Sequence, residues 1–332
     1  MRSVFRVAIL RVAIAVFLVV PSAGLSHAQG QAQGYPNRPV RIVVPFAPGG
    51  VTDVMARLLA QKLSESLGKE FFVDNRAGAG GNIGTGVVAS APADGYTLVL
   101  TSSSYVINPS IHAKIPYDPE KDLTPVTISA VSPNIVTVNP SLPVRSIAEL
   151  IAYVRQSGKA SFASAGVATT PHLSGELFRL SLNLDMVHVP FGGAGPALQS
   201  AIAGHTPIAF TGFPPAVPLV RAGGLRALAV TSTRRLAALP DLPTMAEAGV
   251  PDQEAETMLI ILVPSATPKD IVELLHREIA KIVALPETTQ RLDTLGFEPL
   301  ASTPADSATR IRQELSRWAK VVRDAKIAVQ NP

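Results

Sequence analysis

The chain contains no cysteine, which excludes disulfide bonds, thiolate metal sites and a cysteine nucleophile. It also lacks the Gly-x-Ser-x-Gly, Walker-lysine and His-Glu-x-x-His motifs, and its six histidines are scattered. Asp53 and Asp74 could belong to a catalytic site, but a helix cap and a strand end explain them equally well. We therefore expect a protein that is not an enzyme and that uses neither a metal ion nor a cofactor.

An apolar run long enough to span a membrane is also missing near the N-terminus. Val12 to Val20 covers about half of the roughly 20 residues that a span requires, so a permanent membrane anchor is the weaker interpretation. Three arginines precede this run, and Ser26-His27-Ala28 fits a small-residue cleavage site. We predict a signal peptide over residues 1–28, cleavage before Gln29, and export.

Excess positive charge largely disappears with that peptide. The formal net charge is +4, and cleavage removes three arginines and no acidic residue, which leaves +1. A nearly neutral chain has little electrostatic attraction for nucleic acid or acidic membranes. We expect small or nearly neutral partners and no nucleic acid.

Apolar strand-like runs alternate with helical patterns along the mature chain, which predicts an α/β fold with largely parallel sheets. With about 300 residues, the mature chain should divide into two domains. The expected strands are Val40 to Pro45, Phe71 to Asp74, Thr97 to Thr101, Ile135 to Val138, Ser161 to Ser164, Met186 to Val189, Ile208 to Thr211 and Ala227 to Thr231.

Three helices are predicted with particular clarity. Apolar residues from Met55 to Leu63 recur at helical spacing, and Thr52 or Asp53 is placed to cap the helix start. Thr267-Pro268 opens a second helix, and a last helix carries Trp318 on its apolar face. We expect Trp318 to lie in the core and not to contact a ligand.

Two segments have the character of crossings between domains. The first runs from Pro133 to Pro143 and the second from Pro251 to Glu256. Two crossings make one domain discontinuous. We therefore assign residues 35–134 and 253–332 to the first domain and residues 135–252 to the second.

Several loops combine glycine or hydroxyl residues with the start of a helix. Gly49 and Gly50 allow close approach to the backbone, while Ser164, Thr169 and Thr170 offer hydroxyl groups. Backbone N–H groups at helix starts form a ready site for an anion such as a carboxylate. Because no lysine or arginine lies in these loops, we expect a neutral hydrogen-bonding cage. Taken alone, the glycines could equally form a tight turn with a helix cap.

Longer blocks carry a resemblance to a known family. They are PFAPGGVTD at 45–53, VDNRAGAGGNIGTGVVASAPADGYTL from 73, PYDPEKDLTPV at 116–126, VNPSLPV at 138–144, ASAGVATTPHLSGELF at 163–178, DMVHVPFGGAGPAL at 185–198 and LRALAVTSTRRLAALPDLPTMAEAGVP at 225–251. In this order they cover nearly the whole mature chain. The chain resembles the Bug or TctC family of extracytoplasmic solute receptors.

This resemblance implies a type II periplasmic binding protein, with two α/β domains that close over one ligand. It further implies location in the periplasm, a small organic carboxylate as ligand, and delivery to a two-subunit membrane permease. Two such loops of glycine and hydroxyl residues, facing each other, could hold both ends of a dicarboxylate. An alternative role is ligand sensing, in which the closed receptor engages a sensor kinase. We expect a monomer.

The resemblance also makes Thr101 to Ser103 a ligand loop, whereas alone these residues could form an exposed polar loop. The candidate ligand-binding residues are Phe46, Pro48, Gly49, Gly50, Thr52, Asp53, Thr101, Ser102, Ser103, Ser164, Ala165, Gly166, Thr169, Thr170, His172, Phe191, Gly192, Gly193, Thr211 and Phe213.

Two other features have simpler interpretations than ligand binding. Gly78 to Gly81, followed by Gly84, is similar to a dinucleotide fingerprint, but its third glycine falls one residue late. We interpret this loop as helix packing. His172 follows Pro171 at a helix start and is expected to orient or cap a loop, not to bind a metal.

The chain departs from the family pattern where a ligand would be selected. A basic residue is common at position 192, which is glycine here, and an acidic residue is common near Pro207 to Phe213. An aromatic residue is also common within Thr257 to Leu259. Because Phe46, Phe191 and Phe213 remain, we predict a roomier, more apolar cleft and a carboxylate with an apolar or aromatic body.

Overall fold

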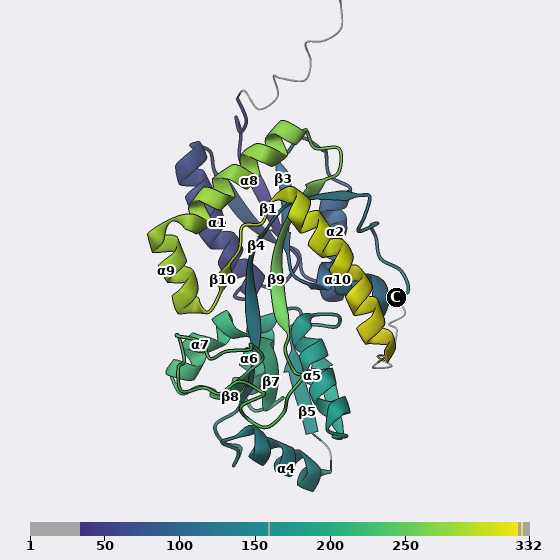
Figure 1. The fold of residues 1–332 in the computed structure, drawn as a ribbon, viewed down its shortest axis with the longest axis vertical. Coiled ribbons are helices and arrows are strands. Elements are labelled where there is room, and N and C mark those ends of the chain that lie inside the picture. The colour runs from purple at the N-terminus through teal and green to yellow at the C-terminus, as the bar shows by residue number, and fades with distance from the viewer. Residues whose placement is uncertain (1–33, 159, 325–326, 328–332) are drawn as a thin grey trace, which may run out of the picture. The chain divides into compact units, whose positions relative to one another are not determined.

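The computed structural model describes residues 34–158, 160–324 and 327. It is a mixed α/β structure whose strands and helices form two lobes (Figure 1). The expected signal peptide, residues 1–28, lies outside the described residues. Within the described residues, every helix is too short or too polar to cross a membrane.

The first lobe is built around parallel strands that alternate with helices. Its opening elements are β1 (Val40–Val44), α1 (Val51–Leu67), β2 (Phe71–Asn75), the 3-10 turn η1 (Ala79–Gly81), α2 (Asn82–Ala89), β3 (Thr97–Thr101) and α3 (Ser104–Ile111). β1 lies between β2 and β3 and is parallel to both. The loops that leave β1 and β3 therefore emerge at the same edge of the sheet, where ligands bind in open α/β folds.

Two long antiparallel strands connect the lobes. They are β4 (Leu123–Val138) and β9 (Glu256–Pro264), and the short β10 (Glu298–Pro299) also pairs with β4. β4 pairs with β9 as far as Pro133 opposite Glu256, and from Asn134 onward it pairs with strands of the second lobe. The expected first crossing thus lies largely inside a strand. The expectation of largely parallel sheets is wrong for β4 and β9, which are antiparallel to their neighbours.

The second lobe repeats the alternation of strand and helix. Its elements are α4 (Ile147–Ser157), β5 (Ala160–Ser164), α5 (Thr170–Ser181), β6 (Met186–Pro190), α6 (Ala194–Ile202), β7 (Ile208–Gly212), α7 (Phe213–Arg221) and β8 (Arg226–Val230). β5 is parallel to β6 and β7, while the end of β4 lies between β7 and β8. All eight expected strand runs are confirmed within a residue or two, although the expected fourth strand is only the end of β4.

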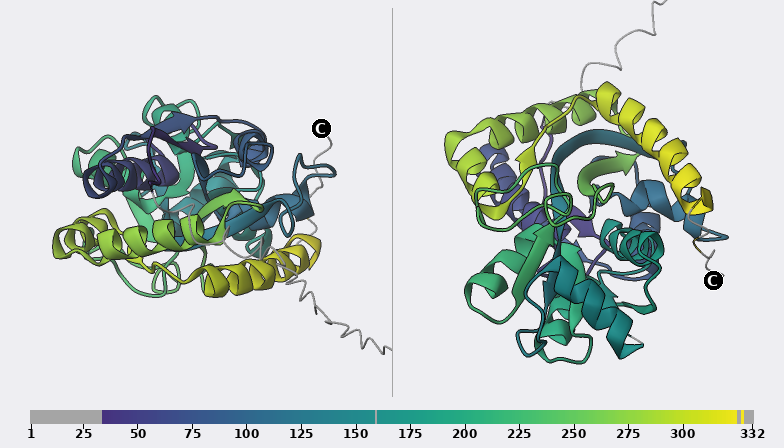
Figure 2. Two further views of the ribbon diagram at one scale, coloured as in Figure 1. Left: turned by 90° about the horizontal axis from the view of Figure 1, so that it is seen from above. Right: turned by 60° about the horizontal axis from the view of Figure 1, so that its bottom comes forward.

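The chain returns to the first lobe through α8 (Lys269–Ala284), α9 (Pro286–Leu295) and α10 (Pro304–Asp324). Figure 2 shows α8 and α10 along one side of this lobe. α8 packs with α1 in one apolar cluster, while α10 packs with α3 in another that includes Trp318, which is buried as expected. The proposed domain limits at 134/135 and 252/253 stay a prediction.

The start of α1 differs from the expected one. Its N-cap is Gly50, so Thr52 and Asp53 lie within the first turn and neither caps the helix.

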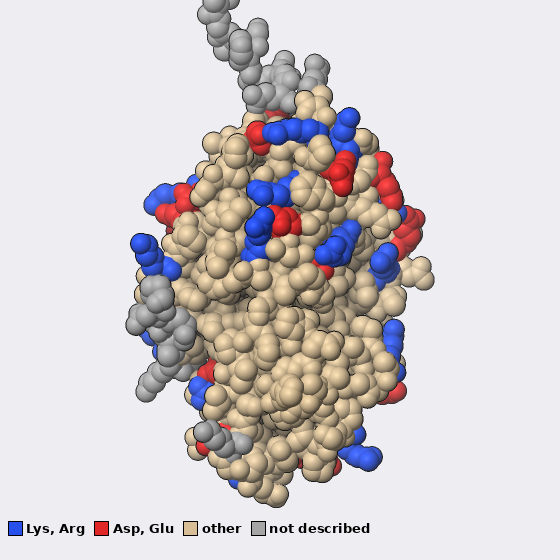
Figure 3. Space-filling view, turned by 180° about the vertical axis from the view of Figure 1, so that it is seen from behind, with Lys and Arg blue, Asp and Glu red and all other residues tan. Residues whose placement is uncertain are grey.

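On the face seen in Figure 3, basic and acidic side chains are interspersed and gather over the upper part of the view. No large patch of one sign is visible on that face.

Candidate functional site

A small cavity lies between the lobes, at the ends of the parallel strands. Its volume is about 30 Å³, close to the share of liquid volume that one water molecule occupies. Its walls come from both lobes and from β9. The lining residues are Phe46, Gly50, Val51, Thr52, Ser102, Ala165, Thr169, Pro171, Ala194, Gly212 and Thr257.

Five helices begin at this cavity. The N-cap residues of α1, α3, α5, α6 and α7 are Gly50, Ser103, Thr169, Gly193 and Gly212, and each caps a helix of eight residues or more whose start is at the cavity or adjoins its lining. The first N–H groups of a helix have no partner within the helix and carry a partial positive charge. The lining side chains of this cavity include no acidic or basic group. The site therefore favours an anion through helix dipoles and backbone N–H groups, with fewer donors from α7, whose Pro214 and Pro215 have no N–H, and from α5, whose Pro171 has none.

Asp53 holds the loop that precedes α1. Its carboxylate accepts hydrogen bonds from the Gly49 amide at 2.9 Å and from the Asn75 side chain at 2.9 Å, and it pairs with Arg57. Asn75 also donates to the carbonyl of Phe46. Burial by itself raises the pKa of Asp53, but the hydrogen bonds from Arg57, Gly49 and Asn75 outweigh it and lower that pKa. Asp53 thus shapes the loop and has no free oxygen directed at a ligand.

A polar network lies where β9 leaves the second lobe. The hydroxyl of Thr257 donates to the hydroxyl of Thr170 at 3.1 Å and contacts the side chain of Asn134 at 3.4 Å, and Asn134 donates to Ser174. All four side chains are buried. Because β4, α5 and β9 each supply part of the network, it ties the crossing strands to the ligand loops.

The lobes touch through backbone atoms at the rim of the cavity. The Ala47 amide donates to the Gly192 carbonyl at 2.9 Å. A methyl group on Gly193 would lie 2.9 Å from the Ala47 nitrogen, and one on Gly195 would lie 2.8 Å from the Pro48 carbonyl oxygen. These contacts hold the loops of the two lobes against each other at the rim of the cavity.

The structure brings six expected residues to the cavity surface, namely Phe46, Gly50, Thr52, Ser102, Ala165 and Thr169. The other expected residues that support this surface from behind or beside it are Pro48, Gly49, Asp53, Ser103, Ser164, Gly166, Thr170, His172, Gly192 and Gly193.

Four expected residues lie elsewhere. Thr101 and Thr211 are fully buried at strand ends, and their hydroxyl groups have no partner. Phe213 is buried in the second-lobe core, and a methyl group on Gly296 would meet its ring at 2.2 Å. Phe191 also packs against that core.

Sequence reasoning missed five lining residues: Val51, Pro171, Ala194, Gly212 and Thr257. Four of them are next to expected residues in the sequence. The correct helix starts were therefore predicted, but not which residue of each start reaches the cavity. Thr257 lies on β9, which was not among the expected strands although Met258 to Val263 form a continuous apolar run.

Glycines at 81 and 84 serve packing, as expected. A methyl group on Gly84 would lie 2.8 Å from Pro45 and from the Arg76 carbonyl, and one on Gly81 would lie 3.2 Å from the Phe46 ring. The loop therefore presses α2 onto the strand that leads to the cavity. Among the described residues, no group of His, Asp and Glu side chains is arranged to hold a metal ion.

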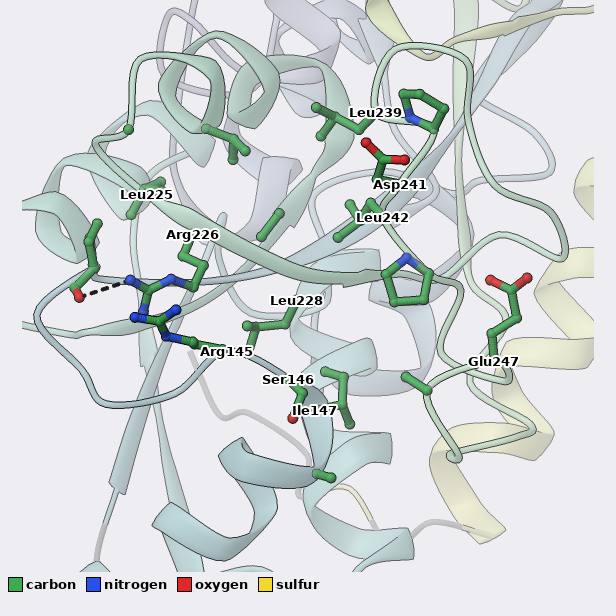
Figure 4. Close-up of a pocket in the computed structure, with 18 residues that line it drawn as sticks. Arg145, Ser146, Ile147, Leu225, Arg226, Leu228, Leu239, Asp241, Leu242 and Glu247 are labelled. Atoms are coloured by element: carbon green, nitrogen blue, oxygen red, sulfur yellow. Dashed lines mark hydrogen bonds between the residues drawn. The ribbon is translucent and has the colours of Figure 1, made fainter.

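A larger groove lies in a different place, within the second lobe (Figure 4). It has a volume of about 690 Å³ and runs beside β8. Its Arg226 guanidinium already donates to the carbonyls of Pro140, Leu142 and Val144. Because one lobe supplies the whole lining, a ligand bound there would gain nothing from closure of the two lobes.

Comparisons with known proteins agree with this geometry. A family model described as "Tripartite tricarboxylate transporter family receptor" matches residues 55–327. Protein BugT of Bordetella pertussis is 37% identical over 317 residues, which are 95% of this chain and 97% of that protein.

Two solved structures match with bound compounds in their descriptions. R. palustris Rpa4515 with adipate has a TM-score of 0.86 at 39% identity, over 89% of this chain and 99% of that one. MatC from Rhodopseudomonas palustris with bound malate has a TM-score of 0.82 at 32% identity, over 87% and 100%. Both matches extend over nearly the whole of the solved chains.

Proposed function

The chain belongs to the tripartite tricarboxylate transporter receptor family, whose members are periplasmic solute receptors and not enzymes, and we propose that it captures a small organic carboxylate between its lobes. The observation that carries the proposal is the convergence of five helix starts on one uncharged cavity. A carboxylate is the anion that such a cage of backbone N–H groups accommodates without a basic side chain. Adipate and malate, which accompany two of the similar structures, are both carboxylates.

The cavity bears on the size of the ligand. At about 30 Å³ it is far below the roughly 300–1,000 Å³ of common small-molecule sites, so entry of a diacid requires the loops to move apart. Phe46 lines the cavity, whereas Phe191 and Phe213 do not. Because the loops must move for either kind of ligand, the apolar or aromatic body stays a prediction for a ligand panel to decide.

Closure of the lobes is the proposed mechanism. The ligand would stabilise the closed arrangement because it contacts helix starts of both lobes at once. The closed receptor, acting as a monomer in the periplasm after cleavage of its signal peptide, would then deliver the ligand to a two-subunit permease. Engagement of a sensor kinase is the alternative role, and a pull-down with ligand-loaded receptor separates the two partners.

Thermal shift of the mature chain, residues 29–332, tests the proposal. Protein unfolded and refolded to remove any co-purified ligand is titrated with aliphatic dicarboxylates, aromatic carboxylates and acidic amino acids. A ligand at about 100 times its dissociation constant adds roughly 2.7 kcal/mol of stability, enough for a shift of a few degrees. The proposal requires a shift with at least one carboxylate and none with the matching primary amides. Absence of any shift with the carboxylates overturns it.

A further inference from the structure

Two histidines from different elements lie ring against ring, with tilted planes, behind the loop between β5 and α5. The rings of His172, in α5, and His188, in β6, have centroids 4.1 Å apart. Phe162 of β5 stacks on the other side of His188 at 5.0 Å. A methyl group on Gly175 would meet the Phe162 ring at 2.2 Å, so the stack is pressed against α5 and has little freedom to shift.

Each imidazole bonds to a different part of the loop between β5 and α5. His188 Nε2 and Ser164 Oγ share a hydrogen bond of 2.7 Å, and Ser164 Oγ also accepts the Gly166 amide at 3.2 Å. At the other end of the loop, His172 Nδ1 accepts the Ala168 amide at 3.3 Å. The two rings therefore hold both ends of one short loop.

That loop supplies two of the cavity's lining residues, Ala165 and Thr169. Thr169 Oγ1 donates to the Gly166 carbonyl at 2.7 Å and accepts the His172 amide. The position of the loop, and with it the start of α5 at the cavity, depends on the histidine pair.

The hydrogen bond at His172 requires an imidazole whose Nδ1 carries no proton. Burial lowers the pKa of His172 to about 4, with a smaller effect from Arg179. Burial likewise lowers the pKa of His188 to about 3, helped by His172 and Arg179 and opposed by Glu176. Glu176 itself is bound to Arg179, which Asp185 also approaches. Both rings are neutral at ordinary periplasmic pH.

We propose that His172 and His188 are positioning residues that hold the loop 165–169 in its ligand-binding shape only while both rings are neutral. This inference rests on the proposed function for its effect on affinity. Protonation of His172 would remove the acceptor for Ala168 and place a charge against a second imidazole 4.1 Å away. The loop would then lose its anchor at Ala168, although a protonated His188 could still donate to Ser164 Oγ, and the ligand would be released as the pH falls.

Matched substitutions separate bonding from packing. His188→Phe keeps a flat ring in the stack but removes the bond to Ser164, whereas His188→Gln places an amide near the former Nε2 and does not titrate. His172→Asn likewise places an amide oxygen near the former Nδ1. His205→Gln is the control, because His205 is exposed and takes no part in these ring contacts.

Hydrogen exchange of the ligand-free protein measures the protection of the amides in the loop 165–169. The Gly166 amide, which donates to Ser164 Oγ, is expected to exchange at least about tenfold faster in His188→Phe than in wild type, with His188→Gln and His205→Gln near wild type. Unchanged exchange in a folded His188→Phe variant overturns the inference. This measurement decides it even if no carboxylate binds, an outcome that would count against the proposed function alone.

Calorimetric titration with the tightest-binding carboxylate of the panel then tests the effect on affinity. At pH 7, the dissociation constant should rise about three- to tenfold in His188→Phe, as expected for one lost hydrogen bond, and stay near wild type in His188→Gln. Between pH 7 and pH 4, the ratio of the wild-type constant to that of the double variant His172→Asn/His188→Gln should rise about twofold. The ratio cancels protonation of the ligand itself. A constant ratio over this range contradicts the requirement for neutral rings.

Discussion

The Ala47 amide donates a hydrogen bond of 2.9 Å to the Gly192 carbonyl, which joins a loop of the first lobe to a loop of the second. The bond uses backbone atoms only, so its formation depends on how closely the two loops approach. Small residues around it, including Gly193 and Gly195, permit that approach. Closure is therefore sensitive to single carbon atoms at this rim.

A methyl group at Gly195 should weaken ligand binding without weakening the fold. Alanine is a better helix former than glycine by up to about 1 kcal/mol, but its methyl group would lie 2.8 Å from the Pro48 carbonyl in the closed form. We expect Gly195→Ala to lower affinity about tenfold or more and to leave the melting temperature of the ligand-free protein unchanged or higher. Gly224→Ala, whose methyl group meets no atom closer than 3.5 Å, is the control. Equal affinity in the two variants would contradict this reading of the rim.

A carboxylate introduced at the start of α6 should exclude the ligand's own carboxylate. Asp is favourable at a helix start, so Ala194→Asp should fold normally while placing negative charge in the cavity lining. Repulsion at about 4 Å is worth roughly 4 kcal/mol near a protein surface, so affinity should fall at least about 100-fold. Ala148→Asp adds the same charge at the start of α4, away from the cavity, and should bind like wild type. Titration calorimetry compares the two.

Removal of the Asp53 carboxylate should cost more stability than removal of its charged partner. Asp53→Ala leaves the Gly49 amide and the Asn75 side chain without their acceptor, at about 1–3 kcal/mol of unfolding free energy. Arg57→Ala deletes a half-exposed cation and leaves the other two bonds in place, so a loss below about 1 kcal/mol is expected. Urea unfolding of both variants at pH 7 gives the comparison. A larger loss of unfolding free energy in Arg57→Ala would mean that the ion pair, and not the hydrogen bonds to the loop, accounts for the stabilising effect of Asp53.

Acid should destabilise the fold before most carboxylates protonate. The pKa values of His172 and His188 are lower in the folded protein than the usual 6.5, so their stabilising effect is complete above pH 6.5. It is lost as the pH falls from about 6.5 toward about 4, because the unfolded chain binds protons first, with a slope of at most about 1.4 kcal/mol per pH unit for each group. Urea unfolding at pH 7, 5.5 and 4.5 measures the slope. The variant His172→Asn/His188→Gln should flatten it, and an unchanged slope would assign the effect to other groups.

The sequence predicted the repeated strand and helix units well, because buried parallel strands such as Val40 to Val44 are continuous apolar runs. The long strand β4 was harder to detect. β4 contains Pro125 and Pro133 and many small polar residues, so its pattern is not that of a usual strand.

The loops of the candidate site could be predicted because glycine and hydroxyl residues follow several predicted strands in the sequence. Which side chains reach the cavity was less predictable. Phe213 and Asp53 are residue types that often line ligand sites. Phe213 nevertheless packs in the core of the second lobe, and Asp53 accepts a hydrogen bond from Gly49 in the loop before α1. Such choices depend on contacts between elements far apart in the sequence, which local patterns do not contain.

The continuous strands β4 and β9 also determine how the lobes can move. A ribbon of two paired strands resists bending, whereas a flexible linker resists only being stretched, which reduces its conformational entropy. At the point where β4 exchanges one set of partners for another stands Pro133, which has no N–H to contribute to the ladder. Bending should therefore concentrate at Pro133. The bending stiffness of β4 and β9 at this position would then limit how far the lobes of a ligand-free receptor separate.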